Sequence, residues 1–107
     1  MGSNESPEAK PIKFDRARWD AKADGKYTYR NQMIFDLLNH HSWKGLSTDS
    51  LYRKLGWPDE REGAELFYIY DSKPFLGGLA TTIETLVIEL SADSTVKDAR
   101  LNDGGWD

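Results

Sequence analysis

Residues 45–58, with the sequence GLSTDSLYRKLGWP, contain the start and stop signals of one short helix. Ser47 is a good N-cap, because its hydroxyl can accept a hydrogen bond from an unpaired backbone N–H of the first turn. Gly56 can adopt the left-handed conformation that commonly ends helices. Between these signals Leu51 and Leu55 lie one turn apart on one face. The stretch therefore predicts a complete helix that packs on a core through its leucines.

A second helix is predicted upstream, over residues 28–41. Met33 and Leu37 share one stripe of this segment, and further apolar residues follow on the next stripe. The connection at residues 42–46 is short, so the two helices are expected to be neighbours in space.

The hydrophobic period changes to two after the second helix. Strands are predicted at 66–70, 82–90 and 95–101, from the alternation of apolar and polar residues or from a high content of β-branched and aromatic residues. The polar run at 59–63 is expected to be a solvent-exposed loop. The strands are joined by short turns, so consecutive strands are expected to pair antiparallel. The sequence therefore predicts an α+β two-layer sandwich, in which two N-terminal helices pack on a three-stranded antiparallel meander (α-α-β-β-β). The apolar residues that share the buried faces are predicted to form the core: Met33, Leu37, Leu51, Leu55, Leu86 and Ile88.

The chain of 107 residues is expected to form one domain with a modest core. Residues 1–11 are polar and are predicted to be a disordered tether or a cloning scar. Residues 12–101 form the predicted α+β domain, to which Phe14 and Trp19 anchor a short helical turn. Residues 102–107 are predicted to be a flexible tail.

Composition excludes several classes of function. A net charge of -4, without a basic stripe, argues against nucleic acid as the main partner. The absence of cysteine from this sequence excludes disulfides and thiolate chemistry within it. No apolar run in the sequence approaches the length of a membrane span. The oligomeric state is not predicted.

Residues 45–101 resemble the SmpA/OmlA (BamE-like) family of small envelope lipoproteins. The resemblance rests on three features: Gly-Leu-Ser followed by Leu55-Gly56-x-Pro58, the aromatic strand 66–70, and the alternation from Leu86 to Leu90 before a turn into Val96. It implies a setting on the periplasmic side of the bacterial cell envelope and a non-enzymatic, accessory role in outer-membrane protein assembly. Membrane contact would come only through a lipid anchor that precedes the sequence shown.

The expected function is therefore that of a protein-binding scaffold without catalytic activity. The β-lactamase-inhibitor proteins have a similar architecture, so an inhibitor or immunity-like protein that blocks an enzyme is the alternative, with a cytoplasmic location. A signal peptide ending at a cysteine just upstream of Asn4 would favour the lipoprotein. Its absence would favour the cytoplasmic inhibitor.

No catalytic, cofactor or metal site is assigned from the sequence. His40 and His41 are adjacent, so on a helix their side chains diverge by about 100° and need a third ligand from elsewhere to hold a metal. The acidic residues from Asp59 to Glu65 surround a glycine and are expected to be solvated. General acid–base catalysis by paired carboxylates needs partial burial to separate their pKa values, so these residues are not predicted to be catalytic. The serines occupy cap and turn positions.

The segment 71–80 is expected to be a long loop that carries the partner contact. Phe75 and Leu76 lie where polar turn residues are usual, so they are predicted to form an exposed anchor with Lys73 on its rim. Two alternatives are that the strands extend further, or that the loop folds back and buries Phe75. The next candidates for partner binding are Trp43 and Trp57, at the helix ends.

Overall fold

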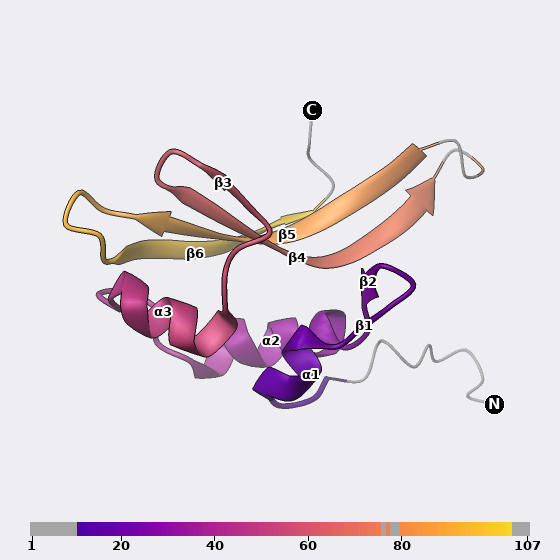
Figure 1. The fold of residues 1–107 in the computed structure, drawn as a ribbon, viewed down its shortest axis with the longest axis horizontal. Coiled ribbons are helices and arrows are strands. Elements are labelled where there is room, and N and C mark those ends of the chain that lie inside the picture. Colours follow the sequence, from indigo (N-terminus) through magenta and orange to yellow (C-terminus); the bar gives the residue numbers. More distant parts are fainter. Residues whose placement is uncertain (1–10, 76, 78–79, 104–107) are drawn as a thin grey trace.

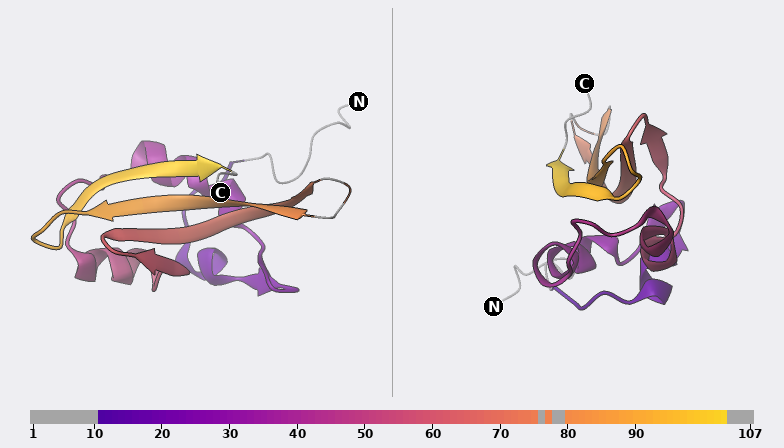
Figure 2. Two further views of the ribbon diagram at one scale, coloured as in Figure 1. Left: turned by 90° about the horizontal axis from the view of Figure 1, so that it is seen from above. Right: turned by 90° about the vertical axis from the view of Figure 1, so that its left-hand side faces the viewer.

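The computed structural model describes residues 11–75, 77 and 80–103, which form a layer of helices on one face of an antiparallel sheet (Figure 1; Figure 2). In chain order the elements are α1 Arg16–Asp20, β1 Lys22–Ala23, β2 Lys26–Tyr27, α2 Arg30–His40, α3 Thr48–Leu55, β3 Glu60–Glu62, β4 Glu65–Phe75, β5 Ala80–Leu90 and β6 Val96–Asp103. The sheet order is β3-β4-β5-β6, and β1 and β2 form a separate hairpin.

The predicted layout of two helices and three strands is wrong, although the chain does combine helices with an antiparallel sheet. The helix α1 has five residues, too few to show a helical period, and it begins where Asp15 accepts a hydrogen bond from the Arg18 N–H. The strand β3 falls in the segment predicted to be a loop. All three of its side chains are exposed, so no alternation marks it, and pairing with β4 forms it.

The helix at residues 45–58 is confirmed as α3. The Ser47 Oγ accepts a hydrogen bond from the Ser50 N–H at 3.1 Å. Gly56 ends the helix with a φ of 83°, a conformation that favours glycine. Leu51 and Leu55 are fully buried. The local signals therefore specify both the ends of this helix and its buried face.

The core lies between the helices and the sheet. The six residues predicted to form it are all fully buried: Met33, Leu37, Leu51, Leu55, Leu86 and Ile88. Trp19 from α1 and Tyr68 from β4 join them, also without exposed surface. The amphipathic periods therefore identify the main core, and α1 adds the residue with the largest side chain.

The predicted loop at 71–80 is wrong, and the alternative of longer strands is confirmed. β4 continues to Phe75 and β5 starts at Ala80, and these two residues are paired in the register. A register shift between Ile69 and Asp71 bends the hairpin, which extends beyond the helical layer (Figure 2). The side chains of Lys73 and Phe75, and Leu76 entirely, lie outside the described residues, as do residues 1–10 of the predicted tether. At the other end, β6 includes two residues of the predicted tail, 102 and 103.

Candidate binding surfaces

A buried arginine joins four parts of the molecule. Arg30, at the start of α2, is only 3% exposed. Its Nε donates to the Trp19 carbonyl at 2.8 Å, and its Nη1 donates to the Ile69 carbonyl at 2.9 Å. The guanidinium carbon lies 3.4 Å from the centroid of the Tyr27 ring and 4.1 Å from that of Trp19. Arg30 therefore connects α1, the β1–β2 hairpin and β4 to α2.

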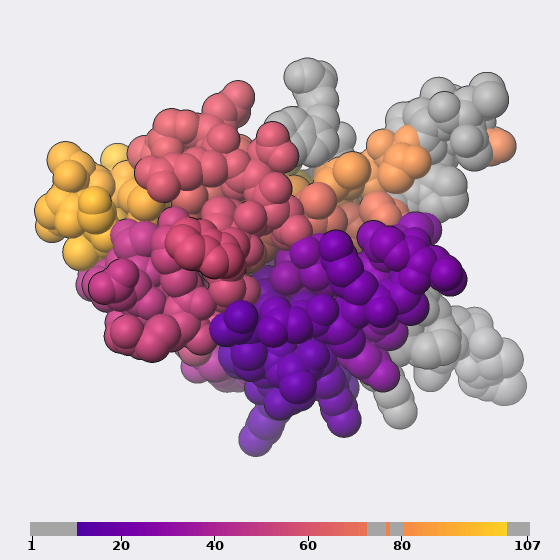
Figure 3. Space-filling view, in the orientation of Figure 1, coloured from indigo at the N-terminus to yellow at the C-terminus, as the bar shows by residue number. Residues whose placement is uncertain are grey.

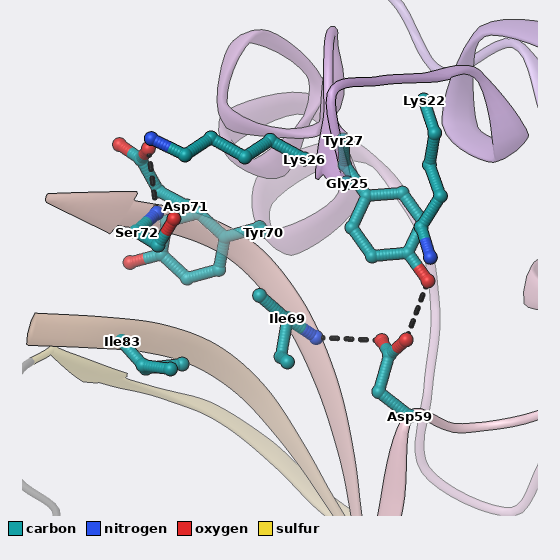
Figure 4. Close-up of a pocket in the computed structure, with 10 residues that line it drawn as sticks. All are labelled: Lys22, Gly25, Lys26, Tyr27, Asp59, Ile69, Tyr70, Asp71, Ser72 and Ile83. Carbon is teal, nitrogen blue, oxygen red and sulfur yellow. Dashed lines mark hydrogen bonds between the residues drawn. The ribbon is translucent and has the colours of Figure 1, made fainter. Parts of the chain in front are cut away.

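Asp59 completes this network from the loop before β3. Its Oδ2 accepts hydrogen bonds from Arg30 Nη1 at 3.0 Å and from the Ile69 N–H at 2.9 Å. Its Oδ1 accepts from the Tyr27 hydroxyl at 2.5 Å (Figure 4). Burial, and then this hydrogen bond to Asp59, raise the pKa of Tyr27 to about 12, so the phenol stays protonated as a donor. The expectation that Asp59 is solvated is wrong, because its carboxylate neutralises a buried guanidinium.

A groove of about 230 Å³ separates the β1–β2 hairpin from β4, with the network at one end (Figure 4). Its lining residues are Lys22, Gly25, Lys26, Tyr27, Asp59, Ile69, Tyr70, Asp71, Ser72 and Ile83. Several backbone groups at the edge of β4 that borders the groove are not available to pair with a strand of another molecule. Ile69 is bonded through both its N–H and its carbonyl, the Ser72 N–H donates to the Asp71 carboxylate at 2.9 Å, and Pro74 has no N–H. These features protect an edge strand against pairing, so we do not propose this groove as a site for strand addition.

The two adjacent histidines converge on one carboxylate, contrary to the divergence expected on a helix. The helix ends at His40, and His41 adopts an extended conformation that turns its ring back. Their ring nitrogens lie 3.0 Å and 3.1 Å from the two oxygens of Asp36. The same carboxylate accepts the Phe14 backbone N–H at 2.8 Å. Within residues 11–75, 77 and 80–103, no three His, Asp or Glu side chains are placed to hold a metal ion. We therefore infer that this cluster holds the segment before α1 on α2, through the hydrogen bond from the Phe14 backbone N–H to Asp36.

An exposed tryptophan lies at the end of α3. Trp57 is 78% exposed, yet its ring lies 4.7 Å from the Tyr52 ring, centroid to centroid. A cleft of about 380 Å³ opens beside the pair, lined by Arg16, Asp49, Tyr52, Arg53, Gly56 and Trp57. We call this surface the aromatic cleft. Figure 3 shows α1 and the C-terminal end of α3 side by side on this face of the molecule.

Arg16 is held in place in the aromatic cleft. Its Nε donates to Asp20 at 2.9 Å and its Nη1 donates to the Arg53 carbonyl at 2.9 Å. Its Nη2 passes close to Gly56, where an added Cβ would lie only 2.8 Å away. The Gly56 carbonyl accepts a hydrogen bond from Tyr68 at 2.8 Å, which fixes the backbone next to Trp57. The cleft is therefore assembled from α1, α3 and the following turn, with its backbone anchored to the sheet.

The residues predicted for partner binding separate into three groups. Trp57 is exposed in the aromatic cleft. Trp43 is a core residue with 7% exposure, and its Nε1 donates to the Leu37 carbonyl at 2.8 Å, so we do not retain it as a contact residue. The side chains of Lys73 and Phe75, and the whole of Leu76, lie outside the described residues, so their part in partner binding stays a prediction. Sequence reasoning missed Arg16, which comes from a separate element and carries no local signal.

Comparisons with known protein families, with curated proteins and with solved structures gave no match to this chain. The resemblance to the SmpA/OmlA family therefore stays a prediction. In the part of the chain that the structure describes, no helix has the length and hydrophobicity needed to cross a membrane.

Proposed function

We propose that this chain is a non-enzymatic domain that binds another protein through the aromatic cleft. The observation that carries the proposal is the 78% exposure of Trp57, an aromatic ring that is nevertheless packed on Tyr52. Tryptophan, tyrosine and arginine are the residue types that dominate binding energy at protein interfaces. An aromatic ring of this size can bury roughly 150–250 Å² when a partner covers it. The aromatic cleft contains all three residue types.

Pre-organisation supports the proposal further. Tyr52 holds the Trp57 ring from one side, and the Tyr68 hydroxyl holds the adjacent Gly56 carbonyl. A contact residue that is already ordered loses less conformational entropy on binding, so more of the contact energy contributes to affinity. By contrast, Tyr27, Arg30 and Asp59 are bonded to one another and to the backbone of several elements, which is typical of a structural network.

A protein-binding role agrees with both hypotheses drawn from the sequence, the envelope scaffold and the enzyme inhibitor. The location in the cell envelope and the identity of the partner stay predictions.

Site-specific photocrosslinking in the native host tests the proposal. A photoreactive amino acid replaces Asp49, which is exposed on the rim of the aromatic cleft. The same amino acid at Phe35 is the matched control, because Phe35 is a 59% exposed residue on α2 that does not line the cleft. We expect one protein to be crosslinked from position 49 and not from position 35.

The Trp57→Ala chain provides the second control. It should lose the crosslink from position 49 while its free energy of unfolding falls by no more than about 1.5 kcal/mol, since only the contact with Tyr52 is lost at an exposed position. An unchanged crosslink in this variant, or the same products from both positions, would refute the proposal. Equilibrium unfolding in urea measures the stability.

A further inference from the structure

We infer that the aromatic cleft recognises an acidic, extended segment of the partner, with a carboxylate beside Arg16 and Arg53 and an apolar side chain on Trp57. This inference rests on the proposed function and specifies the chemistry of its partner.

The geometry of Arg16 is the first argument. Two of its three guanidinium nitrogens are occupied, by Asp20 and by the Arg53 carbonyl, so the orientation of the plane is fixed. Among the described residues, Nη2 forms no hydrogen bond, and it lies along the cleft beside Gly56. The Arg53 side chain lines the same cleft, and within the described part of the chain its one side-chain hydrogen bond is a long contact of 3.4 Å with Ser50 Oγ. A planar guanidinium held in this way is suited to bind a carboxylate.

Charge distribution is the second argument. The whole chain carries a net charge of -4, and the four-stranded sheet carries more acidic than basic residues. The helices on either side of the cleft carry four cations, Arg16, Arg18, Arg53 and Lys54, against the acidic Asp20 and Asp49. The four-stranded sheet carries eight acidic residues against four basic ones: Glu60, Glu62, Glu65, Asp71, Glu84, Glu89, Asp98 and Asp103 against Arg61, Lys73, Lys97 and Arg100. An acidic partner is therefore attracted to the helical face and repelled by the sheet, which fixes the orientation of binding.

The size of the cleft is the third argument. A volume of about 380 Å³ is near the lower end of the range for small-molecule sites, and it accommodates a few side chains. Together with an aromatic pair and two arginines, this favours a short segment that alternates apolar and acidic residues.

Fluorine NMR on the full chain labelled with 5-fluorotryptophan tests the inference. The chain has four tryptophans, and the Trp57→Phe chain assigns the resonance of Trp57. The probes are two capped peptides that contain the triplet Glu-Leu-Glu twice, or Lys-Leu-Lys twice, joined by Gly-Ser. We expect the acidic peptide to shift the Trp57 resonance alone, with an affinity that falls as salt is added. The basic peptide should leave it unchanged.

Charge variants separate recognition from a general electrostatic effect. Arg53→Gln should weaken binding of the acidic peptide roughly fivefold, the effect of losing an exposed charge contact. Asp20→Asn should strengthen binding, because it removes the negative charge that competes for Arg16, while the amide oxygen can still accept the Nε hydrogen bond that orients the guanidinium. Asp24→Asn makes the same change in net charge in the β1–β2 turn and should alter the affinity much less.

Equal shifts with both peptides, or equal effects of Asp20→Asn and Asp24→Asn, would overturn the inference. If crosslinking from position 49 depends on Trp57 but the acidic peptide does not bind, the proposed function stands and this partner chemistry is wrong. If the peptide binds but no crosslink forms in the host, the cleft has the inferred chemistry and the proposed function fails.

Discussion

Two regions of this molecule use the same chemistry for opposite purposes. In the buried network Arg30 lies against Trp19 and pairs with Asp59, and the two charged side chains are only 4% and 18% exposed. In the aromatic cleft Arg16 pairs with Asp20, and their side chains are 43% and 51% exposed. The comparison teaches that burial decides the role. A charge pair that is mostly buried holds the fold together, whereas one that is largely exposed to water contributes little to stability and is accessible to a partner.

Substitution of the two arginines gives the largest expected contrast. Arg30→Met should lower the free energy of unfolding by about 3–5 kcal/mol, because it leaves Asp59 without its charge partner and two carbonyls without their donor. Arg16→Met is the matched variant and should cost less than about 1 kcal/mol. Urea denaturation of both chains measures the difference. Similar losses in the two variants would mean that burial does not separate the two regions.

Two leucines extend the comparison to residues without charge. Leu86 and Leu101 are paired across β5 and β6, but Leu86 is fully buried and Leu101 is 39% exposed. Leu86→Ala should cost about 2–5 kcal/mol, since it removes core contacts and leaves a cavity. Leu101→Ala should cost clearly less, because solvent already covers part of its side chain. If the melts showed equal losses, the helix-facing side of β6 would carry as much of the core as β5.

The features that were predicted correctly from the sequence are those whose pattern lies within a single helix or strand. Leu51, Leu55, Leu86 and Ile88 were assigned correctly, because their spacing within a helix or a strand matches the local period. The caps of α3 were also predicted, since Ser47 and Gly56 act on the backbone within a few residues.

The remaining features depend on contacts between distant residues. Arg30 and Asp59 are 29 residues apart, and each alone resembles a solvated charge. Trp43 and Trp57 both follow helices, and only the tertiary structure shows that one is buried and the other exposed. The strand β3 has no apolar residue, so its pairing with β4 leaves no hydrophobic pattern in the sequence.

Asp36 provides an intermediate case between the two charge pairs. The Phe14 backbone N–H, followed by the hydrogen bonds of His41 and His40, holds the pKa of Asp36 at about 2, below its ordinary value of 3.8. A carboxyl whose pKa is lower in the folded chain stabilises the fold at pH values above the unfolded pKa. That stabilisation is lost as the pH falls from about 4 towards 2. We expect it to amount to about 1–2 kcal/mol, since the cluster lies partly at the surface.

The variant Asp36→Asn tests this effect through urea melts at several values between pH 2 and pH 5. The wild-type chain should be the more stable of the two at pH 5, and the difference should shrink towards pH 2, where about half of the wild-type carboxyls are protonated. Asp20→Asn is the control, because Asp20 is half exposed and its pair with Arg16 should contribute little to stability at any of these values. A difference for Asp36→Asn that stays constant with pH would mean that the loss comes from altered packing around Phe14. In that case the carboxylate charge would not be what holds the segment before α1 on α2.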